Sequence, residues 1–337
     1  MKKVTVIGSG SWGTALAVML AKNDHDVMIW SRRQDAVDEL LVDRKNERYL
    51  PGIVIPENIK ATTDREAAVE GAEIIILAVP SRAVAETVRD FSPYLKTWQI
   101  LVNVAKGLEP GTLLCLSDVI EREAPQCKVC VLSGPSHAEE VARGIPTTCL
   151  ITCEEEEVAK VVQEEFANPR FRLYTNTDMI GVEIGAALKN VMALGSGIAL
   201  GLGFGDNTRA ALITRGIAEI KRLGIRMGCN DQTFSGLAGI GDLIVTATSE
   251  HSRNNKCGKL IGKGMSVEDA VKAVGMVVEG INALPTIVFA ITLVTVLGPG
   301  VGKLILCLIV VNLPGIARLV RSQVLSIREK EFEECAT

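Results

Sequence analysis

The chain has 337 residues, which is enough for two domains of ordinary size. Its 36 lysines and arginines and its 40 aspartates and glutamates give a net charge of −4. This balance argues against a broad nucleic-acid surface, which needs a basic face, but it allows a small anionic substrate held by a few cations.

Two of the nine cysteines, Cys127 and Cys130, have the spacing of zinc or redox sites. No second such pair follows, and no histidine stands at ligand spacing. We therefore interpret the cysteines as reduced residues of a cytosolic protein and expect no metal. The first residues lack signal-peptide architecture, so we expect no secretion signal.

The first half of the chain alternates between predicted strands and helices. The run Ile74–Val79 has six apolar residues, as in a strand that is covered on both faces. A helix is expected at residues 14–21, and further strands at 2–7, 27–30, 100–104 and 129–132. This alternation predicts βαβ units in a doubly wound, mostly parallel sheet.

The second half has a different pattern. No strand alternation is found from Asp178 to residue 283, and Ala, Gly and Leu recur through 183–200 and 209–223. We therefore predict a Rossmann-type α/β dinucleotide-binding domain at residues 1–180. An all-α domain for substrate binding and dimerisation is predicted at 181–337.

A glycine-rich turn, Gly8-x-Gly10-x-x-Gly13, follows the first predicted strand and opens a helix. In this context the pattern predicts a dinucleotide site. Gly8 permits the tight turn, Gly10 lets the backbone approach a pyrophosphate, and Gly13 allows close helix packing. The free N–H groups at the helix start then face the phosphates.

The end of the second strand bears on the choice of cofactor. An acidic residue there would bind the ribose of NAD, but the chain has Arg32 and Arg33. Two guanidinium groups favour the 2′-phosphate of NADPH, although solvated surface arginines and NADH remain alternatives. Residues 78–81, after the long apolar strand, are expected on the nicotinamide side.

Hydride transfer at an alcohol carbon needs a group that moves the hydroxyl proton. Lys189 is the best candidate, because it is the only charge in a small and apolar stretch, where burial and a second cation would lower its pKa. Lys106 could be that cation or a phosphate ligand. Of the three histidines, His25 is expected at the surface, and His137 and His251 have no obvious carboxylate partner.

Two polar stretches lie in apolar surroundings. Asp242 is the one carboxylate in the small-residue loop 239–243. Residues 249–255 combine hydroxyl, guanidinium and amide donors, the set that holds a phosphate ester. A surface turn explains either stretch equally well.

Several motifs in order resemble the bacterial NAD(P)-dependent glycerol-3-phosphate dehydrogenases over residues 1 to about 284. The matching stretches are 8–13, 103–107, 132–142, 187–190, 236–243, 251–254 and 275–280. This resemblance implies interconversion of dihydroxyacetone phosphate and sn-glycerol 3-phosphate for glycerophospholipid synthesis. It also implies a cytosolic homodimer that needs no metal, nucleic acid or membrane.

The resemblance assigns roles residue by residue. Lys189 would be the proton acceptor. Substrate contacts would be Lys106, Gly134, Ser136, Asp242, Ser252, Arg253 and Asn254. Cofactor contacts beside the three glycines would be Ser11, Trp12, Arg32, Arg33, Lys106, Ala138, Arg253, Val277 and Glu279.

The tail departs from the family. Residues 286–320 are almost wholly apolar where amphipathic, charged helices are usual. A buried variant, a membrane-associating tail and an altered reading frame all fit this pattern. The predicted site residues precede the tail, so dimer packing and solubility depend on it more than catalysis does.

Two other functions compete with the main hypothesis. A related dehydrogenase acting on a hydroxyacid could also place a Lys-Asn pair on the first helix of its second domain. A non-catalytic NAD(P)-sensing protein is the alternative outside the enzymes. The phosphate donors Ser252, Arg253 and Asn254 favour a phosphate ester over a hydroxyacid.

Overall fold

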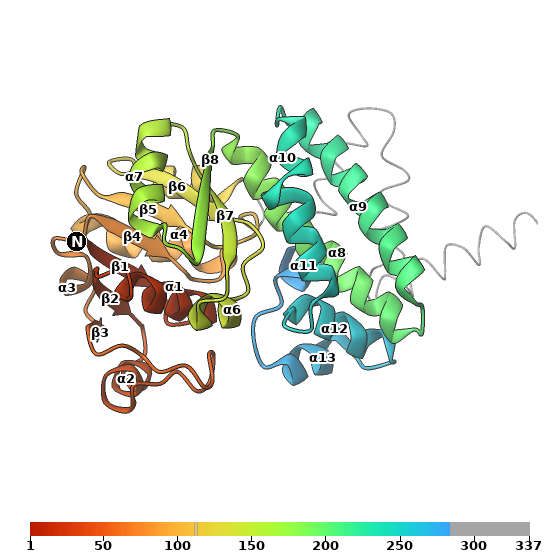
Figure 1. The fold of residues 1–337 in the computed structure, drawn as a ribbon, viewed down its shortest axis with the longest axis horizontal. Helices are drawn as coiled ribbons and strands as arrows, with labels where there is room; N and C mark the ends of the chain where they lie inside the picture. The colour runs from red at the N-terminus through yellow and green to blue at the C-terminus, as the bar shows by residue number, and fades with distance from the viewer. Residues whose placement is uncertain (111, 113, 284–337) are drawn as a thin grey trace, which may run out of the picture.

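The computed structural model describes residues 1–110, 112 and 114–283. A sheet flanked by helices forms the first part of the chain, and helices alone form the second (Figure 1). Helix α8, Met179–Gly201, starts beside the sheet and runs through the helical part. The apolar tail, and with it the three interpretations of its sequence, lies outside the described residues.

The sheet has eight strands in the order β3-β2-β1-β4-β5-β6-β7-β8. All neighbours are parallel except β6 and β7. The predicted doubly wound, mostly parallel sheet is therefore confirmed. The strands are β1 Lys3–Ile7, β2 Asp26–Trp30, β3 Ile59–Thr62, β4 Ile74–Leu77, β5 Ile100–Asn103, β6 Lys128–Ser133, β7 Thr147–Cys153 and β8 Phe171–Asn176.

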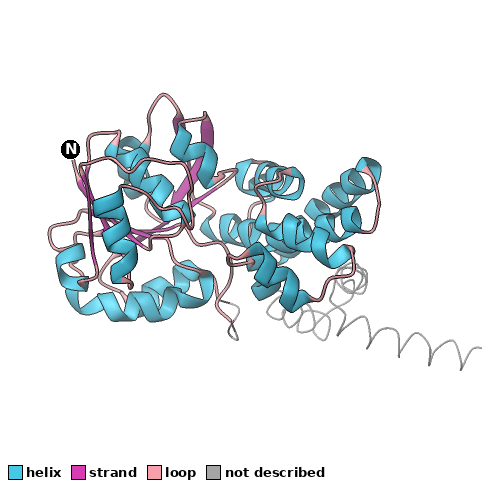
Figure 2. Cartoon of the chain, turned by 90° about the horizontal axis from the view of Figure 1, so that it is seen from below, coloured by secondary structure: helices cyan, strands magenta, loops and turns pink. Residues whose placement is uncertain are grey.

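Helices cover both faces of the sheet, as Figure 2 shows from below. In β4, Ile74 and Ile76 pack into the core beneath α1, α6 and α7, whereas Ile75 and Leu77 pack beneath α3, α4 and α5. The prediction of a strand buried on both faces is thus confirmed. These helices are α1 Ser11–Ala21, α2 Gln34–Asp38, α3 Arg65–Val69, α4 Val84–Phe91, α5 Leu116–Glu123, α6 Ala138–Arg143 and α7 Glu156–Phe166.

The second part of the chain is helical from residue 179, and no strand occurs in residues 178–283, as predicted. Its helices are α8, α9 Asp206–Arg226, α10 Asp231–Ser235, α11 Asp242–Thr248, α12 Arg253–Gly262 and α13 Val267–Val274. Among the described helices, α8 alone is long and apolar enough to cross a membrane, and 72% of its most apolar window is buried in the protein.

Glycines bring α8 and α12 very close together. A Cβ on Gly258 would lie 2.2 Å from the backbone oxygen of Leu194, and one on Gly197 would lie 2.2 Å from that of Asn255. Any side chain at these positions would force the helices apart. The small residues of both helices therefore fix α12 against α8.

The expectation for His25 was wrong. This side chain is 5% exposed because the turn after α1 is covered by α7 and the segment that follows it. Nδ1 accepts a hydrogen bond from the Lys2 amide at 3.1 Å, and Nε2 lies 2.8 Å from the Glu165 carbonyl oxygen. His25 is a structural residue at the amino edge of the sheet.

Candidate active site

The glycine-rich turn lies between β1 and α1, at the carboxyl edge of the parallel strands. Gly8 has φ +118°, and a Cβ there would lie 2.5 Å from the carbonyl oxygen of Ala78. A Cβ on Gly13 would lie 2.2 Å from the carbonyl oxygen of Gly8, whereas Gly10 has nothing within 4 Å. Gly8 and Gly13 are therefore required by packing, and Gly10 leaves open space where a pyrophosphate fits.

The surroundings of the turn also fit a dinucleotide. The first turn of α1 holds no acidic residue, and no side chain caps it, so its N–H groups are free for phosphate. Trp12 Nε1 is buried without a hydrogen-bond partner in the described part of the chain. Ala138, the first residue of α6, packs in the same small cluster as Trp12.

The two arginines that follow β2 differ in their surroundings. Arg32 is exposed, while Arg33 is half-buried and lies 3.2 Å from Asp35 through its Nε. Arg32 is thus available to bind a phosphate, whereas Arg33 is already paired with Asp35, which offsets its charge.

Three charged side chains from distant segments meet across the two halves of the chain. Asp242, the first residue of α11, accepts hydrogen bonds from Lys189 Nζ at 2.5 Å and from Lys106 Nζ at 2.8 Å. Lys189 is 5% exposed and Asp242 is 1% exposed. Two amines therefore share one carboxylate at the end of β5, with Lys189 on the buried side of the cluster.

The cluster perturbs the acidity of its members. Burial lowers the pKa of Lys189 to about 7; the Lys106 ammonium adds to this effect, and Asp242 opposes it. Burial would raise the pKa of Asp242, but the two ammonium groups outweigh it and hold that pKa below the usual value. The prediction that burial and a second cation bring Lys189 near neutrality is confirmed.

Asp242 does not lie in a loop, as the sequence suggested. Residues Leu237–Gly241 form a short π-helical turn that leads directly into α11. Thr246, one helical turn after Asp242, accepts a hydrogen bond from Lys189 Nζ at 2.7 Å and donates one to the Asp242 carbonyl at 2.6 Å. Sequence reasoning missed Thr246, although the spacing of four residues would have indicated it on a helix.

The loop after β6 lines the other side of this cluster. Lys106 Nζ donates to the Gly134 carbonyl at 2.9 Å, and Ser136 Oγ donates to the same oxygen at 3.0 Å. His137 Nε2 is buried without a partner among residues 1–110, 112 and 114–283, and its ring centroid lies 5.7 Å from that of His251. Burial and the charge of Lys189 lower the pKa of His137, which favours its neutral form.

The predicted phosphate donors begin helix α12. The Ser252 side chain caps this helix by accepting from the Asn255 amide at 3.2 Å. Asn254 donates to Asn190 Oδ1 at 3.0 Å and accepts from the Gly280 amide at 2.8 Å. Asn254 is thus tied directly to the residue that follows Lys189.

Arg253 and Glu279 connect this region to the cofactor side. Burial lowers the pKa of Arg253, with Glu279 and Glu139 opposing through their charges. Glu279 accepts hydrogen bonds from Ser81 Oγ at 2.8 Å and the Ser81 amide at 3.2 Å. Ser81 follows β4 and belongs to the segment that the sequence predicts on the nicotinamide side. Val277, two residues before Glu279, is half-buried.

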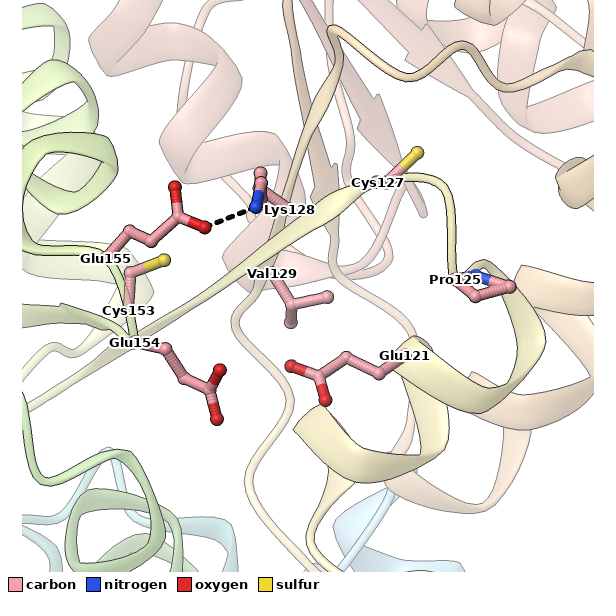
Figure 3. A pocket seen from close by; sticks show the side chains of 8 residues that line it. All are labelled: Glu121, Pro125, Cys127, Lys128, Val129, Cys153, Glu154 and Glu155. Atoms are coloured by element: carbon pink, nitrogen blue, oxygen red, sulfur yellow. Dashed lines mark hydrogen bonds and ion pairs between the residues drawn. The ribbon is translucent and has the colours of Figure 1, made fainter.

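A separate surface hollow of about 330 Å³ lies at the opposite edge of the sheet, where β6 begins (Figure 3). Glu121, Glu154, Glu155 and Cys127 line it, and Lys128 forms an ion pair with Glu155. No predicted site residue belongs to its lining. The described residues contain no group of three or more His, Cys, Asp or Glu side chains arranged to hold a metal ion.

The first part of the chain is a Rossmann-type domain whose glycine turn leaves N–H groups free to bind phosphate. The helical part supplies a buried lysine of lowered pKa. Together these features define a nicotinamide-dependent dehydrogenase of two domains. The family models agree. The NAD-dependent glycerol-3-phosphate dehydrogenase N-terminus matches residues 3–159, and the C-terminus matches residues 178–295. The chain belongs to this family.

Individual relatives extend over most of the chain. It is 54% identical to a glycerol-3-phosphate dehydrogenase (NAD(P)+) of Bacillus pumilus, over 84% of this chain and 83% of that one. The glycerol-3-phosphate dehydrogenase (NAD(P)+) of Fusobacterium nucleatum is 52% identical to it, over 86% of this chain and 87% of that one. A crystal structure of glycerol-3-phosphate dehydrogenase from Coxiella burnetii superposes with a TM-score of 0.84 and is 38% identical in sequence. The match covers 86% of this chain and 89% of that one.

Proposed function

We propose that this protein interconverts dihydroxyacetone phosphate and sn-glycerol 3-phosphate with NADPH, or with NADH, and so supplies glycerophospholipid synthesis. The observation that carries the proposal is the buried cluster of Lys189, Asp242 and Lys106. In this cluster an amine with a pKa of about 7 shares a carboxylate with Lys106, which we propose as a ligand of the substrate phosphate. Family membership supplies the substrate.

Lys189 moves the proton in this proposal. In glycerol 3-phosphate oxidation, the neutral Nζ accepts the proton of the C2 hydroxyl while C2 loses a hydride, and in the reverse direction the ammonium returns that proton to the oxygen. The bound nicotinamide supplies or accepts the hydride. Asp242 and Thr246 hold Nζ in place, and Asp242 offsets part of the positive charge.

The substrate phosphate is proposed to lie among the donors on the two sides of the cluster. Support comes from the free donor capacity of Lys106 and from Arg253 at the start of α12. The proposed substrate contacts are Lys106, Gly134, Ser136, Asp242, Ser252, Arg253 and Asn254.

The cofactor is proposed to extend from the glycine turn to the cluster. Support comes from the open space at Gly10 and from the unpartnered Nε1 of Trp12. The proposed cofactor contacts are Gly8, Gly10, Ser11, Trp12, Gly13, Arg32, Arg33, Lys106, Ala138, Arg253, Val277 and Glu279.

We also propose a cytoplasmic homodimer, divided into a dinucleotide-binding domain at 1–180 and a helical domain at 181–337. The seven cysteines of the described residues are all buried free thiols, which suits a reducing compartment. Light scattering of the purified full chain tests the dimer, and fractionation of cells tests the compartment.

A spectrophotometric assay tests the function. Oxidation of NADPH and of NADH is followed at equal concentrations with dihydroxyacetone phosphate, and with a panel of 2-keto acids as the matched alternative. We expect turnover with dihydroxyacetone phosphate only. Turnover with a keto acid alone would support the hydroxyacid hypothesis, and cofactor binding without turnover on any substrate would support the sensor.

A further inference from the structure

Glu183 is a second buried charge on α8, six residues before Lys189. Its side chain is 2% exposed, and its neighbours on the helix are apolar or small. A buried carboxylate is unfavourable unless it is hydrogen-bonded, so its partners indicate what this residue is for. The proton transfer proposed above does not use it.

The partners of Glu183 come from the sheet domain. The Ser117 amide donates to Oε1 at 3.2 Å and to Oε2 at 3.3 Å, and Ser117 Oγ also donates to Oε2. Asn103 Nδ2 donates to Oε1 at 3.5 Å. Because the protein groups around the carboxylate are donors, the charged form is the one that these contacts stabilise.

Asn103 continues this connection toward the reacting centre. It is the last residue of β5, and its side chain folds over the turn that follows. Oδ1 accepts from the Ala105 amide at 3.0 Å, and Nδ2 donates to the Ala105 carbonyl at 3.3 Å. Lys106 is the next residue, so the carboxylate of Glu183 supports the turn that presents Lys106 to Asp242.

Glu183 is also rigidly connected to Lys189. Both lie on one uninterrupted helix, and six residues of α-helix span about 9 Å. A displacement of α8 relative to β5 would therefore move Lys189 away from Lys106, although both must reach the same carboxylate of Asp242. A misplacement of about 1 Å can reduce a catalytic rate by about a hundredfold.

We propose that Glu183 is a positioning residue, which sets the distance between Lys106 and Lys189 across Asp242 by fixing α8 to the end of β5 and the start of α5. The inference rests on the proposed function, because it concerns the residue that moves the proton. Glu183 itself does not reach the cluster through any contact that the structure gives.

Burial raises the pKa of Glu183 to about 7, while the hydrogen bonds from Ser117 oppose this shift. The charge of Asp118 adds to this rise, and Glu183 in turn raises the pKa of the neighbouring Cys115 thiol. Protonation would replace one accepting oxygen by a donor that faces the Ser117 amide and hydroxyl. The fixation of α8 is therefore strongest above a pH of about 7, where the carboxylate is charged.

The substitution Glu183→Gln tests the proposal because it keeps the shape of the side chain and turns one acceptor into a donor. We expect kcat with dihydroxyacetone phosphate to fall about ten- to a hundredfold, while KM for substrate and for NADPH stays within about threefold. The pH at which kcat is half-maximal should also move, because the surroundings of Lys189 change. Ser117→Ala removes one donor and should give a smaller effect in the same direction.

Asp178→Asn is the matched control. Asp178 caps the same helix by accepting from the Gly181 amide at 3.0 Å, and it also accepts from the Asn230 amide at 2.9 Å. Both contacts lie away from Lys106. This substitution should lower the unfolding temperature and leave kcat and its pH profile unchanged.

The outcomes separate the two proposals. Absence of turnover by the wild-type enzyme would contradict the proposed function itself. An active wild type with a Glu183→Gln variant that loses thermal stability, but keeps the wild-type kcat and pH profile, would overturn the positioning role. If Glu183→Gln does not fold by circular dichroism, Ser117→Ala decides: unchanged kinetics in that variant would contradict the proposal.

Discussion

Lys189 owes its chemistry to its neighbours. Its isolation among small and apolar residues predicted burial and a lowered pKa from sequence, and both are confirmed. The sequence also singled out Asp242, but not the contact between the two, because they are 53 residues apart. Only the packing of α11 against α8 brings Asp242 and Thr246 to the same amine.

At this scale we predict the effect of Lys189→Met, which removes the amine and keeps most of the stem. kcat should fall about 10²- to 10⁴-fold in both directions, the usual contribution of a general acid–base group. Lys256→Met, at an exposed position on α12, is the control and should retain wild-type kcat. A Lys189→Met enzyme with wild-type turnover would contradict the proposed role.

The pH profile of the wild type gives an independent check on Lys189. Glycerol 3-phosphate oxidation needs the neutral amine, so its kcat should rise as pH increases through about 7. Reduction of dihydroxyacetone phosphate needs the ammonium, so its kcat should fall over the same range. Profiles that rise or fall together in both directions would contradict this assignment.

Among the elements, the buried strands were the easiest to predict. The strands predicted from mainly apolar stretches correspond to β1, β2, β4, β5 and β6, with each end within two residues. The prediction missed β3, β7 and β8, which complete the two sides of the sheet. Their sequences include polar residues, and β3 and β8 also have exposed ones, so they lack the continuous apolar run of β4.

Glycines explain why the sequence around Asp242 indicates a loop, although the structure is helical there. Three glycines in residues 236–241 are typical of turns. In the structure, a Cβ on Gly239 would lie 2.1 Å from the carbonyl oxygen of Phe234, so this glycine permits close packing inside a helical segment. Sequence alone does not distinguish these two uses of glycine, because the crowding atoms come from the tertiary fold.

Close packing at glycines also predicts how much stability is lost when a side chain is added between α8 and α12. Gly258→Ala should lower the free energy of unfolding by about 1–3 kcal/mol, because its Cβ would overlap the Leu194 carbonyl. Gly205→Ala is the control, since it precedes α9 and its Cβ would meet nothing within 4 Å. Urea denaturation of both variants measures the difference. Equal stability of the two would contradict the packing argument.

For the whole molecule, composition and periodicity predicted a sheet domain and a helical domain, but not how they meet. Contacts that join them include Lys106 with Asp242 and Ser81 with Glu279 at the candidate site, and Ser117 with Glu183 away from the lysine cluster. Each pairs residues at least 66 positions apart, and such pairings depend on the complete topology. The interface therefore lay beyond what local patterns predict.

Cofactor binding should stabilise the molecule as a unit. NADPH at about 100 times its Kd adds about 2.7 kcal/mol to the free energy of unfolding, so we expect a rise of several degrees in Tm by calorimetry. Arg32→Ser should reduce the rise in Tm caused by NADPH and leave the rise caused by NADH unchanged, because only NADPH carries the 2′-phosphate. An equal loss with both cofactors would contradict the proposed role of Arg32.

The continuity of α8 has a practical consequence for protein engineering. Residues 177–178 connect the end of β8 at Asn176 to the start of α8 at Met179, and α8 carries both Glu183 and Lys189. A chimaera that exchanges whole sheet domains between relatives, to alter cofactor preference, has its natural crossover in this short connection. The sheet domain that is introduced must carry hydrogen-bond donors at positions 103 and 117, because these residues bind the carboxylate of Glu183 in the retained helical domain.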